Sequence, residues 1–128
     1  MTKLLSFLAI AFLATAAYAA EFPDISIKDL KKAIEAKKVV LIDVNGTESW
    51  QNAHIPGAVN FETYEGKLTS VLPKDKKALV VAYCGGPTCK AYQAAANAAK
   101  KLGYKNVKHL SVGISGWNKA GEKTDKGA

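Results

Sequence analysis

Cys84 is the residue of this chain best placed to do chemistry. It begins the segment Cys84-Gly85-Gly86-Pro87-Thr88-Cys89-Lys90 and follows an apolar run that predicts a buried strand. Glycines let the backbone curl so that successive N–H groups point inward, and the start of a following helix adds unpaired N–H groups and a positive dipole end. Such a cradle lowers the pKa of a thiol and holds an anionic sulfur species. The segment therefore predicts a nucleophilic Cys84 surrounded by the backbone of residues 85–90.

Cys89 is the second cysteine of the chain, and the sequence leaves three roles open for it. Two cysteines on either side of a short loop can come within disulfide range, above all in an oxidising compartment. Cys89 is then either a regulatory or resolving thiol that attacks a persulfide or disulfide on Cys84, or one half of a permanent structural disulfide. The third role is that of a small buried apolar side chain at the start of a helix.

Two other thiol chemistries use similar residues. Cysteine phosphatases share the spacing from Cys84 to Lys90, but they clamp phosphate with a bidentate guanidinium, and this chain contains no Arg. A thiol hydrolase would pair Cys84 with His54 as the base and Asp43 as the group that orients it. We instead interpret His54 as fixing the turn that follows it, and Asp43 as a hydrogen-bond acceptor that organises a loop.

The sequence indicates no metal or cofactor site. The residues between Cys84 and Cys89 form the glycine cradle, and the two histidines, His54 and His109, are far apart in the sequence. The chain also lacks a Cys-x-x-Cys-His haem attachment motif and a phosphate-loop motif. We therefore expect neither a metal ion nor a cofactor.

The segments around Cys84 alternate between strand and helix patterns. Short runs of β-branched and apolar residues predict strands buried on both faces, which is typical of a parallel sheet. Helical spacing after the capping box of Ser26 and Asp29, and an alanine-rich segment before Gly103, predict helices. The expected strands are 39–42, 58–61, 78–83 and 106–110, and the expected helices are 27–37, 62–73, 90–102 and a short turn from Trp117. Residues 43–53 and 111–116 are expected to be loops and the tail from Gly121 to be loose. This alternation predicts an α/β domain.

Residues 1–19 have the pattern of a cleavable signal peptide. Lys3 precedes an uncharged run over 4–17 that is shorter than the ~20 residues of a membrane span, and Ala17-Tyr18-Ala19 is a small-x-small cleavage pattern. An uncleaved amino-terminal anchor is the alternative. We expect cleavage after Ala19, a single domain over residues 20–128, and a periplasmic product with no further membrane insertion.

The charge of the chain is strongly positive. All 18 basic residues are lysines, and the net charge is +7. The lysines are scattered in pairs, whereas a nucleic-acid interface concentrates Lys, Arg and stacking aromatics on one patch. The pattern argues against nucleic-acid binding and favours a general attraction for small anions.

Four segments, in order along the chain, resemble the rhodanese family. Leu41-Ile42-Asp43-Val44, followed by Glu48 and Trp50, is similar to the family's opening strand and its Asp-Val signature. His54-Ile55-Pro56-Gly57-Ala58-Val59-Asn60 is similar to its His-Ile-Pro-Gly-Ala segment, and Tyr83-Cys84 matches its catalytic cysteine at a strand end. After Gly103-Tyr104, the segment Gly113-Ile114-Ser115-Gly116-Trp117 resembles the closing Gly-Gly-x-x-Gly-Trp pattern, with Val112 in place of the first glycine.

The resemblance implies a single rhodanese-like domain with a mostly parallel sheet of about five strands and helices on both faces. It implies a sulfurtransferase in which Cys84 attacks the outer sulfur of thiosulfate or a persulfide, keeps that sulfur as a persulfide, and passes it to a thiol or cyanide acceptor. The backbone from Gly85 to Lys90 would hold the transferred sulfur, and Lys90 would help to place an anionic donor. The expected partners are a small anionic sulfur donor or a protein persulfide, and a thiol acceptor or a periplasmic redox protein.

Two positions depart from the family pattern. Asn45 stands where members commonly carry Arg, and Cys89 stands where they commonly carry a basic residue. Both departures remove positive charge from the loop, which favours a persulfide donor over thiosulfate. They also favour an alternative function, a non-catalytic or redox-sensing rhodanese-like binding module in which Cys84 and Cys89 alternate between thiols and a disulfide.

Overall fold

The computed structural model describes residues 22–127, so the expected signal peptide and its cleavage site lie outside the described residues. Four strands form a parallel sheet in the order β2-β1-β3-β4. The strands are β1 (Val39–Asp43), β2 (Val59–Asn60), β3 (Leu79–Tyr83) and β4 (Asn106–His109). Beyond β4, Asp24 forms a single parallel bridge with His109, and this bridge takes the place of the expected fifth strand in the part of the chain that is described. The predicted α/β fold with a parallel sheet is confirmed.

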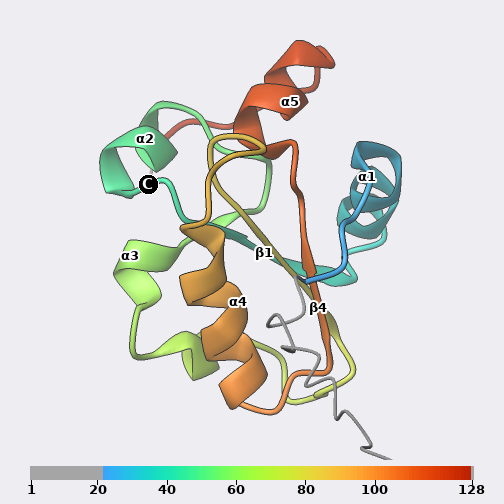
Figure 1. Cartoon of the computed structure of the whole chain (residues 1–128), viewed down its shortest axis with the longest axis vertical. Helices are drawn as coiled ribbons and strands as arrows, with labels where there is room; N and C mark the ends of the chain where they lie inside the picture. Colours follow the sequence, from blue (N-terminus) through green and yellow to red (C-terminus); the bar gives the residue numbers. More distant parts are fainter. Residues whose placement is uncertain (1–21, 128) are drawn as a thin grey trace, which may run out of the picture.

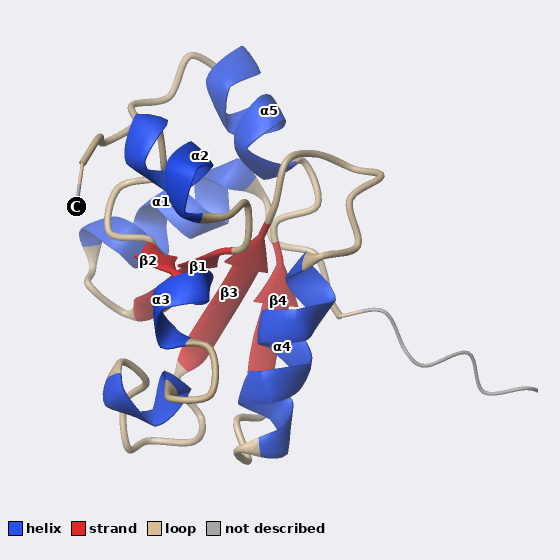
Figure 2. Ribbon diagram, turned by 90° about the vertical axis from the view of Figure 1, so that its left-hand side faces the viewer, coloured by secondary structure: helices blue, strands red, loops and turns tan. Residues whose placement is uncertain are grey.

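The helices cover both faces of the sheet. They are α1 (Ile27–Glu35), α2 (Thr47–Asn52), α3 (Phe61–Tyr64), α4 (Tyr92–Lys101) and α5 (Gly113–Lys119), with a 3₁₀ turn, η1 (Leu68–Ser70). Figure 2 shows α3 and α4 in front of the sheet and α1 behind it, while α2 and α5 lie beyond the carboxyl ends of the strands. Figure 1 shows the same arrangement from another side. Within residues 22–127, no helix combines the length and the apolar character needed to cross a membrane.

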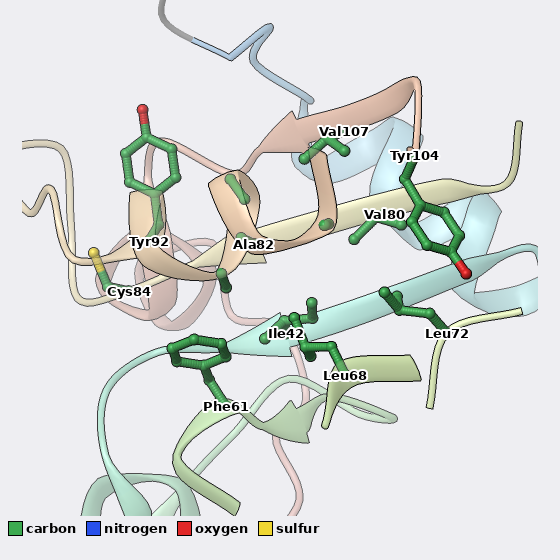
Figure 3. Close-up of a cluster of buried hydrophobic side chains, with 13 residues drawn as sticks. Ile42, Phe61, Leu68, Leu72, Val80, Ala82, Cys84, Tyr92, Tyr104 and Val107 are labelled. Carbon is green, nitrogen blue, oxygen red and sulfur yellow. The ribbon is translucent and has the colours of Figure 1, made fainter. Parts of the chain in front are cut away.

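Side chains on β3 alternate between two apolar clusters, one on each face of the sheet. Val80, Ala82 and Cys84 belong to the cluster under α3 and α4, which Figure 3 draws. Val81 and Tyr83 belong to the cluster under α1 and α5. This alternation follows from the two-residue side-chain period of a strand, so Cys84 and the preceding Tyr83 face opposite layers.

Helix α2 lies within the segment 43–53 that the sequence predicts as a loop, so that prediction is wrong. No side chain at its N-cap residue, Gly46, satisfies the first turn. Instead, Glu62 accepts hydrogen bonds at Oε2 from the backbone N–H of Thr47 (2.7 Å) and from its hydroxyl (2.6 Å). These hydrogen bonds lower the pKa of Glu62. The capping group comes from a residue distant in sequence, which local pattern cannot reveal.

Three other boundaries differ from expectation. Helix α4 begins at Tyr92 rather than at position 90, and the expected helix over 62–73 is split into α3 and η1 around Gly66, whose φ is +77°. Helix α5 begins at Gly113, inside the segment predicted as a loop and ahead of Trp117. Gly66 explains the split, because a positive φ is incompatible with a right-handed helix and glycine adopts it without strain.

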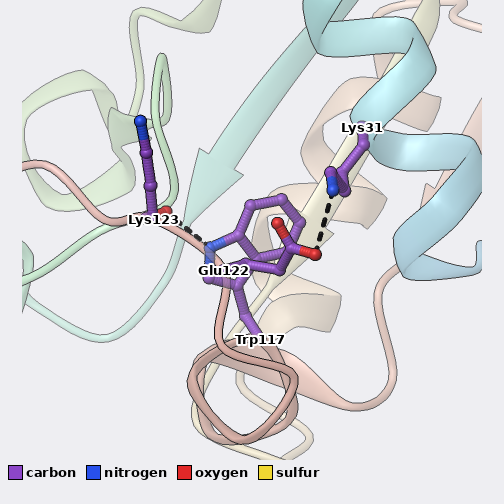
Figure 4. Close-up of polar contacts among 4 residues, drawn as sticks. All are labelled: Lys31, Trp117, Glu122 and Lys123. Atoms are coloured by element: carbon purple, nitrogen blue, oxygen red, sulfur yellow. Dashed lines mark hydrogen bonds and ion pairs between the residues drawn. The ribbon is translucent and has the colours of Figure 1, made fainter.

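The tail from Gly121 is attached to the domain, so the prediction that it is loose is wrong. Figure 4 shows two of its contacts. The Lys31 ammonium on α1 lies 3.0 Å from a Glu122 carboxylate oxygen, and the Trp117 indole N–H donates to the Lys123 carbonyl at 2.7 Å. Because exposed ion pairs contribute little stability, the hydrogen bond to the buried indole is the stronger of the two restraints.

Candidate active site

Cys84 follows β3 directly and is almost completely buried, with 1% of its surface exposed. Its side chain belongs to the cluster that also contains Phe61 and Tyr92, and Figure 3 shows its sulfur at the end of that cluster near Tyr92. The carboxyl end of a parallel sheet is where α/β domains place their ligands. The structure therefore places the expected nucleophile at the end of the sheet where chemistry is expected.

The first turn of α5 fixes the peptide groups that follow Cys84. The backbone N–H of Ile114 donates to the Cys84 carbonyl at 3.0 Å, and that of Ser115 donates to the Gly85 carbonyl at 2.9 Å. In a trans peptide the C=O and the N–H of one unit point in opposite directions. The N–H groups of Gly85 and Gly86 therefore point away from α5.

Those two N–H groups are available to a ligand. Within residues 22–127, neither the N–H of Gly85 nor that of Gly86 donates a hydrogen bond, whereas the next carbonyl, that of Gly86, accepts from the Cys89 N–H at 3.1 Å. Unpaired backbone donors next to a sulfur stabilise negative charge on it. The sequence predicts a backbone cradle over residues 85–90. In that segment the N–H groups of Thr88 and Lys90 likewise donate no hydrogen bond within the described residues.

Only glycine at position 113 permits this contact between α5 and the loop. Gly113 has φ +61°, and a Cβ on it would lie 2.6 Å from each of three backbone atoms, those of Cys84 (O), Gly85 (C) and Gly86 (N). Real Cβ atoms do not approach backbone so closely. The sequence analysis quoted Gly113 as part of a family pattern but did not find its role, because the signal is a tertiary contact.

Cys84 and Cys89 form a disulfide, with their Cα atoms 6.2 Å apart. The bond occupies both cysteines of the chain. Cys89 is partly exposed, and the neighbouring Thr88 and Lys90 are exposed. This pairing excludes the interpretation of Cys89 as an unbonded apolar side chain in the described state, and the Cys84 sulfur must be reduced before it can act as a nucleophile.

Asp43 lies at the end of β1, paired in register with Tyr83 on β3. It is fully buried, and it accepts hydrogen bonds from the Tyr83 hydroxyl at Oδ2 (2.6 Å) and from the Asn45 backbone N–H at Oδ1 (2.8 Å). The Tyr83 oxygen in turn accepts from the Ile55 N–H at 3.0 Å. Asp43 thus holds the loop after β1, and Tyr83, which the sequence analysis did not single out for a role, joins that loop to the segment after His54.

The two ionisable groups of this pair have shifted pKa values. Burial raises the pKa of Asp43 above its ordinary 3.8, although hydrogen bonds from Tyr83 and Asn45 oppose the shift. Burial and the adjacent carboxylate raise the pKa of Tyr83 above its ordinary value. Tyr83 therefore remains a protonated donor, which suits a structural rather than an acid–base function.

The His54 side chain is bound to helix α2, which precedes it in the chain. Its ring Nδ1 donates to the Trp50 carbonyl at 2.6 Å, and the ring stacks on the Trp50 indole with centroids 4.2 Å apart. Its backbone exchanges two hydrogen bonds with Asp125 of the tail. Among the contacts of residues 22–127 there is no hydrogen bond between His54 and Cys84, so the dyad of a thiol hydrolase is not assembled in this part of the chain.

Asn45, which stands where members of the family commonly carry Arg, lies beside the loop that follows Cys84. A Cβ built on Gly85 would lie 3.8 Å from the Asn45 Oδ1. A neutral amide thus stands next to the cradle, and the exposed Lys90 is the nearest basic residue in sequence. Positive charge at the loop comes from backbone N–H groups and lysine side chains rather than from a guanidinium, because the chain contains no Arg.

A sequence model of the rhodanese-like domain matches residues 26–120. The chain belongs to the rhodanese-like domain family. It is 37% identical over 101 residues to the HTH-type transcriptional regulator Rv0324 of Mycobacterium tuberculosis, covering 78% of this chain and 43% of that protein. It is 30% identical over 100 residues to the thiosulfate sulfurtransferase GlpE of Shewanella oneidensis, covering 77% of this chain and 95% of that protein. The crystal structure of BH2092 from Bacillus halodurans superposes with a TM-score of 0.70 at 28% identity, over 81% of this chain and 77% of that one.

These relatives confirm the rhodanese resemblance found in the sequence. The chain spans less than half of the regulator's length and nearly all of the sulfurtransferase's length. At the level of the family, the rhodanese-like domain has relatives named as sulfurtransferases.

Replacing Gly113 by alanine should disrupt the site, and Gly66→Ala provides the matched control. Both glycines have positive φ, but a Cβ on Gly66 meets nothing within 4 Å. We expect Gly66→Ala to cost about 1–2 kcal/mol of unfolding free energy from φ alone. Gly113→Ala should cost a further ~1–3 kcal/mol from overpacking. Urea unfolding of both variants measures the difference, and equal losses would contradict the close contact between α5 and the loop.

Asp43→Asn should change the pH dependence of stability. Because burial raises the pKa of Asp43, the folded state keeps its proton at pH values where the unfolded chain has lost it. The stability of the wild type relative to Asp43→Asn should therefore fall as pH rises from about 3.8 through the raised pKa, by at most ~1.4 kcal/mol per pH unit, and then stay constant. Urea unfolding at a series of pH values tests this, and a relative stability that rises with pH would show the shift to be wrong.

Proposed function

We propose that the chain is an exported sulfurtransferase that carries a sulfane sulfur as a persulfide on Cys84. The observation that carries the proposal is the position of Cys84 at the end of β3, directly before two glycines whose N–H groups donate no hydrogen bond within the described residues. A persulfide is anionic at its outer sulfur, and such donors stabilise it better than they stabilise a neutral thiol. The relatives named as thiosulfate sulfurtransferases support the same reaction class.

The reaction has two displacement steps on the reduced protein. The Cys84 thiolate attacks the outer sulfur of thiosulfate, a new S–S bond forms at Cys84, and sulfite leaves with the electron pair of the broken bond. The Gly85 and Gly86 N–H groups hold the charge on the transferred sulfur. A thiolate or cyanide acceptor then attacks that outer sulfur, and Cys84 leaves as a thiolate. A persulfide donor reacts in the same way, with a thiolate in place of sulfite.

Lys90 supplies positive charge for an anionic donor at the exposed rim of the loop. It is a point charge with free rotation, so it attracts an anion without fixing its orientation. Together with Asn45 beside Gly85, this arrangement favours donors that need little charge neutralisation, and persulfides belong to that class.

A second candidate is a redox-sensing binding module that uses the same loop. The disulfide between Cys84 and Cys89 favours it, because this bond blocks the nucleophile. In that function the bond would change the shape of the loop for a partner protein, and no sulfur would be transferred.

Export is part of the proposal and rests on residues 1–19. The charged start, the apolar run and the Ala17-Tyr18-Ala19 pattern support secretion. The disulfide in the described domain also supports it, since stable disulfides are typical of oxidising compartments. We place the mature protein, residues 20–128, in the periplasm.

Cys84→Ser should abolish sulfur transfer without unfolding the domain. After full reduction and addition of thiosulfate with an excess thiol acceptor, sulfite release should fall by at least ~10³-fold, to the uncatalysed rate, because the nucleophile is lost. Cys89→Ser is the matched control, since it removes the same disulfide but keeps the nucleophile. Sulfite release by Cys84→Ser at the wild-type rate would overturn the mechanism, and no release by the wild type would favour the redox module.

The cleavage site can be tested by mass spectrometry of the protein from a periplasmic extract. The expected mass is that of residues 20–128. Ala19→Phe should block cleavage at this site, because the cleaving enzyme requires a small residue there, whereas Tyr18→Ala, at the unrestricted middle position, should not. Recovery of a protein that still contains Lys3 would instead indicate an uncleaved anchor.

A further inference from the structure

The disulfide brings the Cys89 sulfur into bonding contact with one particular atom, the Sγ of Cys84. In a persulfide on Cys84 this Sγ is the inner of the two sulfurs. A thiol that attacks the outer sulfur receives it, whereas a thiol that attacks the inner sulfur expels it. The position of Cys89 therefore suits the second reaction, and the family mechanism described above does not use it.

We propose that Cys89 resolves the Cys84 persulfide by attacking its inner sulfur and releasing hydrosulfide. This inference rests on the proposed sulfurtransferase function and names the fate of its sulfur. The Cys89 thiol loses its proton, its sulfur bonds to the Cys84 Sγ, and the bond from that Sγ to the outer sulfur breaks. The outer sulfur leaves with the bonding pair and takes up the proton as HS⁻. The protein product is the disulfide that the structure contains.

The loop is built to keep Cys89 close to Cys84. The Cys89 N–H donates to the Gly86 carbonyl at 3.1 Å, which turns the chain back within one short segment. The carbonyls of Cys84 and Gly85 are held from the other side by the first turn of α5. A thiol fixed so near its target reacts as an intramolecular group, with a large advantage in effective concentration over an external thiol.

The exposure of the two cysteines determines which sulfur an external thiol attacks when the disulfide is reduced. Cys84 is 1% exposed, whereas Cys89 is partly exposed and stands between the exposed Thr88 and Lys90. An external dithiol therefore attacks the Cys89 sulfur, the disulfide breaks, and Cys84 leaves as a thiolate into the cradle. The second thiol of the reductant then releases Cys89. In the full cycle thiosulfate and a dithiol give sulfite, hydrogen sulfide and a disulfide, so the partner has the chemistry of a dithiol reductant.

The test uses the mature protein, reduced, freed of reductant without oxygen, and mixed with one equivalent of thiosulfate and no added thiol. Sulfite, hydrosulfide and intact protein mass are measured. The wild type should release one equivalent each of sulfite and hydrosulfide, and its mass should fall by two hydrogens. Cys89→Ser should release sulfite, retain the mass of one added sulfur atom, and release no hydrosulfide. Thr69→Ser, an exposed change outside the loop that keeps both cysteines, should behave as the wild type.

Two results would overturn the inference and leave the sulfurtransferase function intact. In the first, the wild type releases sulfite but keeps the added sulfur with both cysteines unbonded. In the second, Cys89→Ser releases hydrosulfide as fast as the wild type. If no variant gains sulfur from thiosulfate, and none gains it when a small-molecule persulfide replaces thiosulfate, the proposed function itself is wrong, and the inference falls with it.

Discussion

The start of α5 packs so closely against the loop after β3 that there is no room for a side chain at position 113. A Cβ on Gly113 would lie 2.6 Å from three backbone atoms of that loop, and this closeness lets the N–H groups of Ile114 and Ser115 reach the carbonyls of Cys84 and Gly85. The peptide planes are thereby oriented, and the N–H groups of Gly85 and Gly86 point away from α5. A site made of backbone dipoles is only as precise as the contact that orients them. In the proposed mechanism, the chemistry of Cys84 therefore depends on a glycine in a different element.

This backbone site also explains why the two departures from the family pattern belong together. The loop has Asn45 rather than a guanidinium beside Gly85, and it has a thiol rather than a positive charge at Cys89. Both changes weaken electrostatic capture of an anionic donor, and the second places a nucleophile next to Cys84. Under the proposed mechanism, a protein with these features gains less from binding its donor tightly and more from releasing the transferred sulfur at its own Cys89. The proposed export is consistent with this chemistry, because in an oxidising compartment a dithiol partner would have to restore the two thiols.

Sequence analysis predicted those features that depend on local pattern. The buried strands, the capped α1 and the order of strand, cysteine loop and helix all follow from propensity and periodicity, and the structure contains them. It failed where one segment is completed by another that is distant in sequence. Helix α2 is capped by Glu62, and the tail is held by Trp117 and His54, so neither has a signal of its own. The role of Tyr83 was missed for the same reason, because an apolar strand pattern does not show that its hydroxyl reaches Asp43.

The most direct test of the backbone cradle is a pair of amide NMR spectra of the reduced Cys89→Ser protein, recorded before and after one sulfur atom is added to Cys84. The N–H protons of Gly85 and Gly86 should move downfield, because they gain an anionic hydrogen-bond acceptor. Those of Ile114 and Ser115 should change less, since they keep their carbonyl partners in the loop. If the mass shows that the persulfide has formed while the Gly85 and Gly86 resonances stay where they were, the backbone does not hold the transferred sulfur, and the account of this site is wrong.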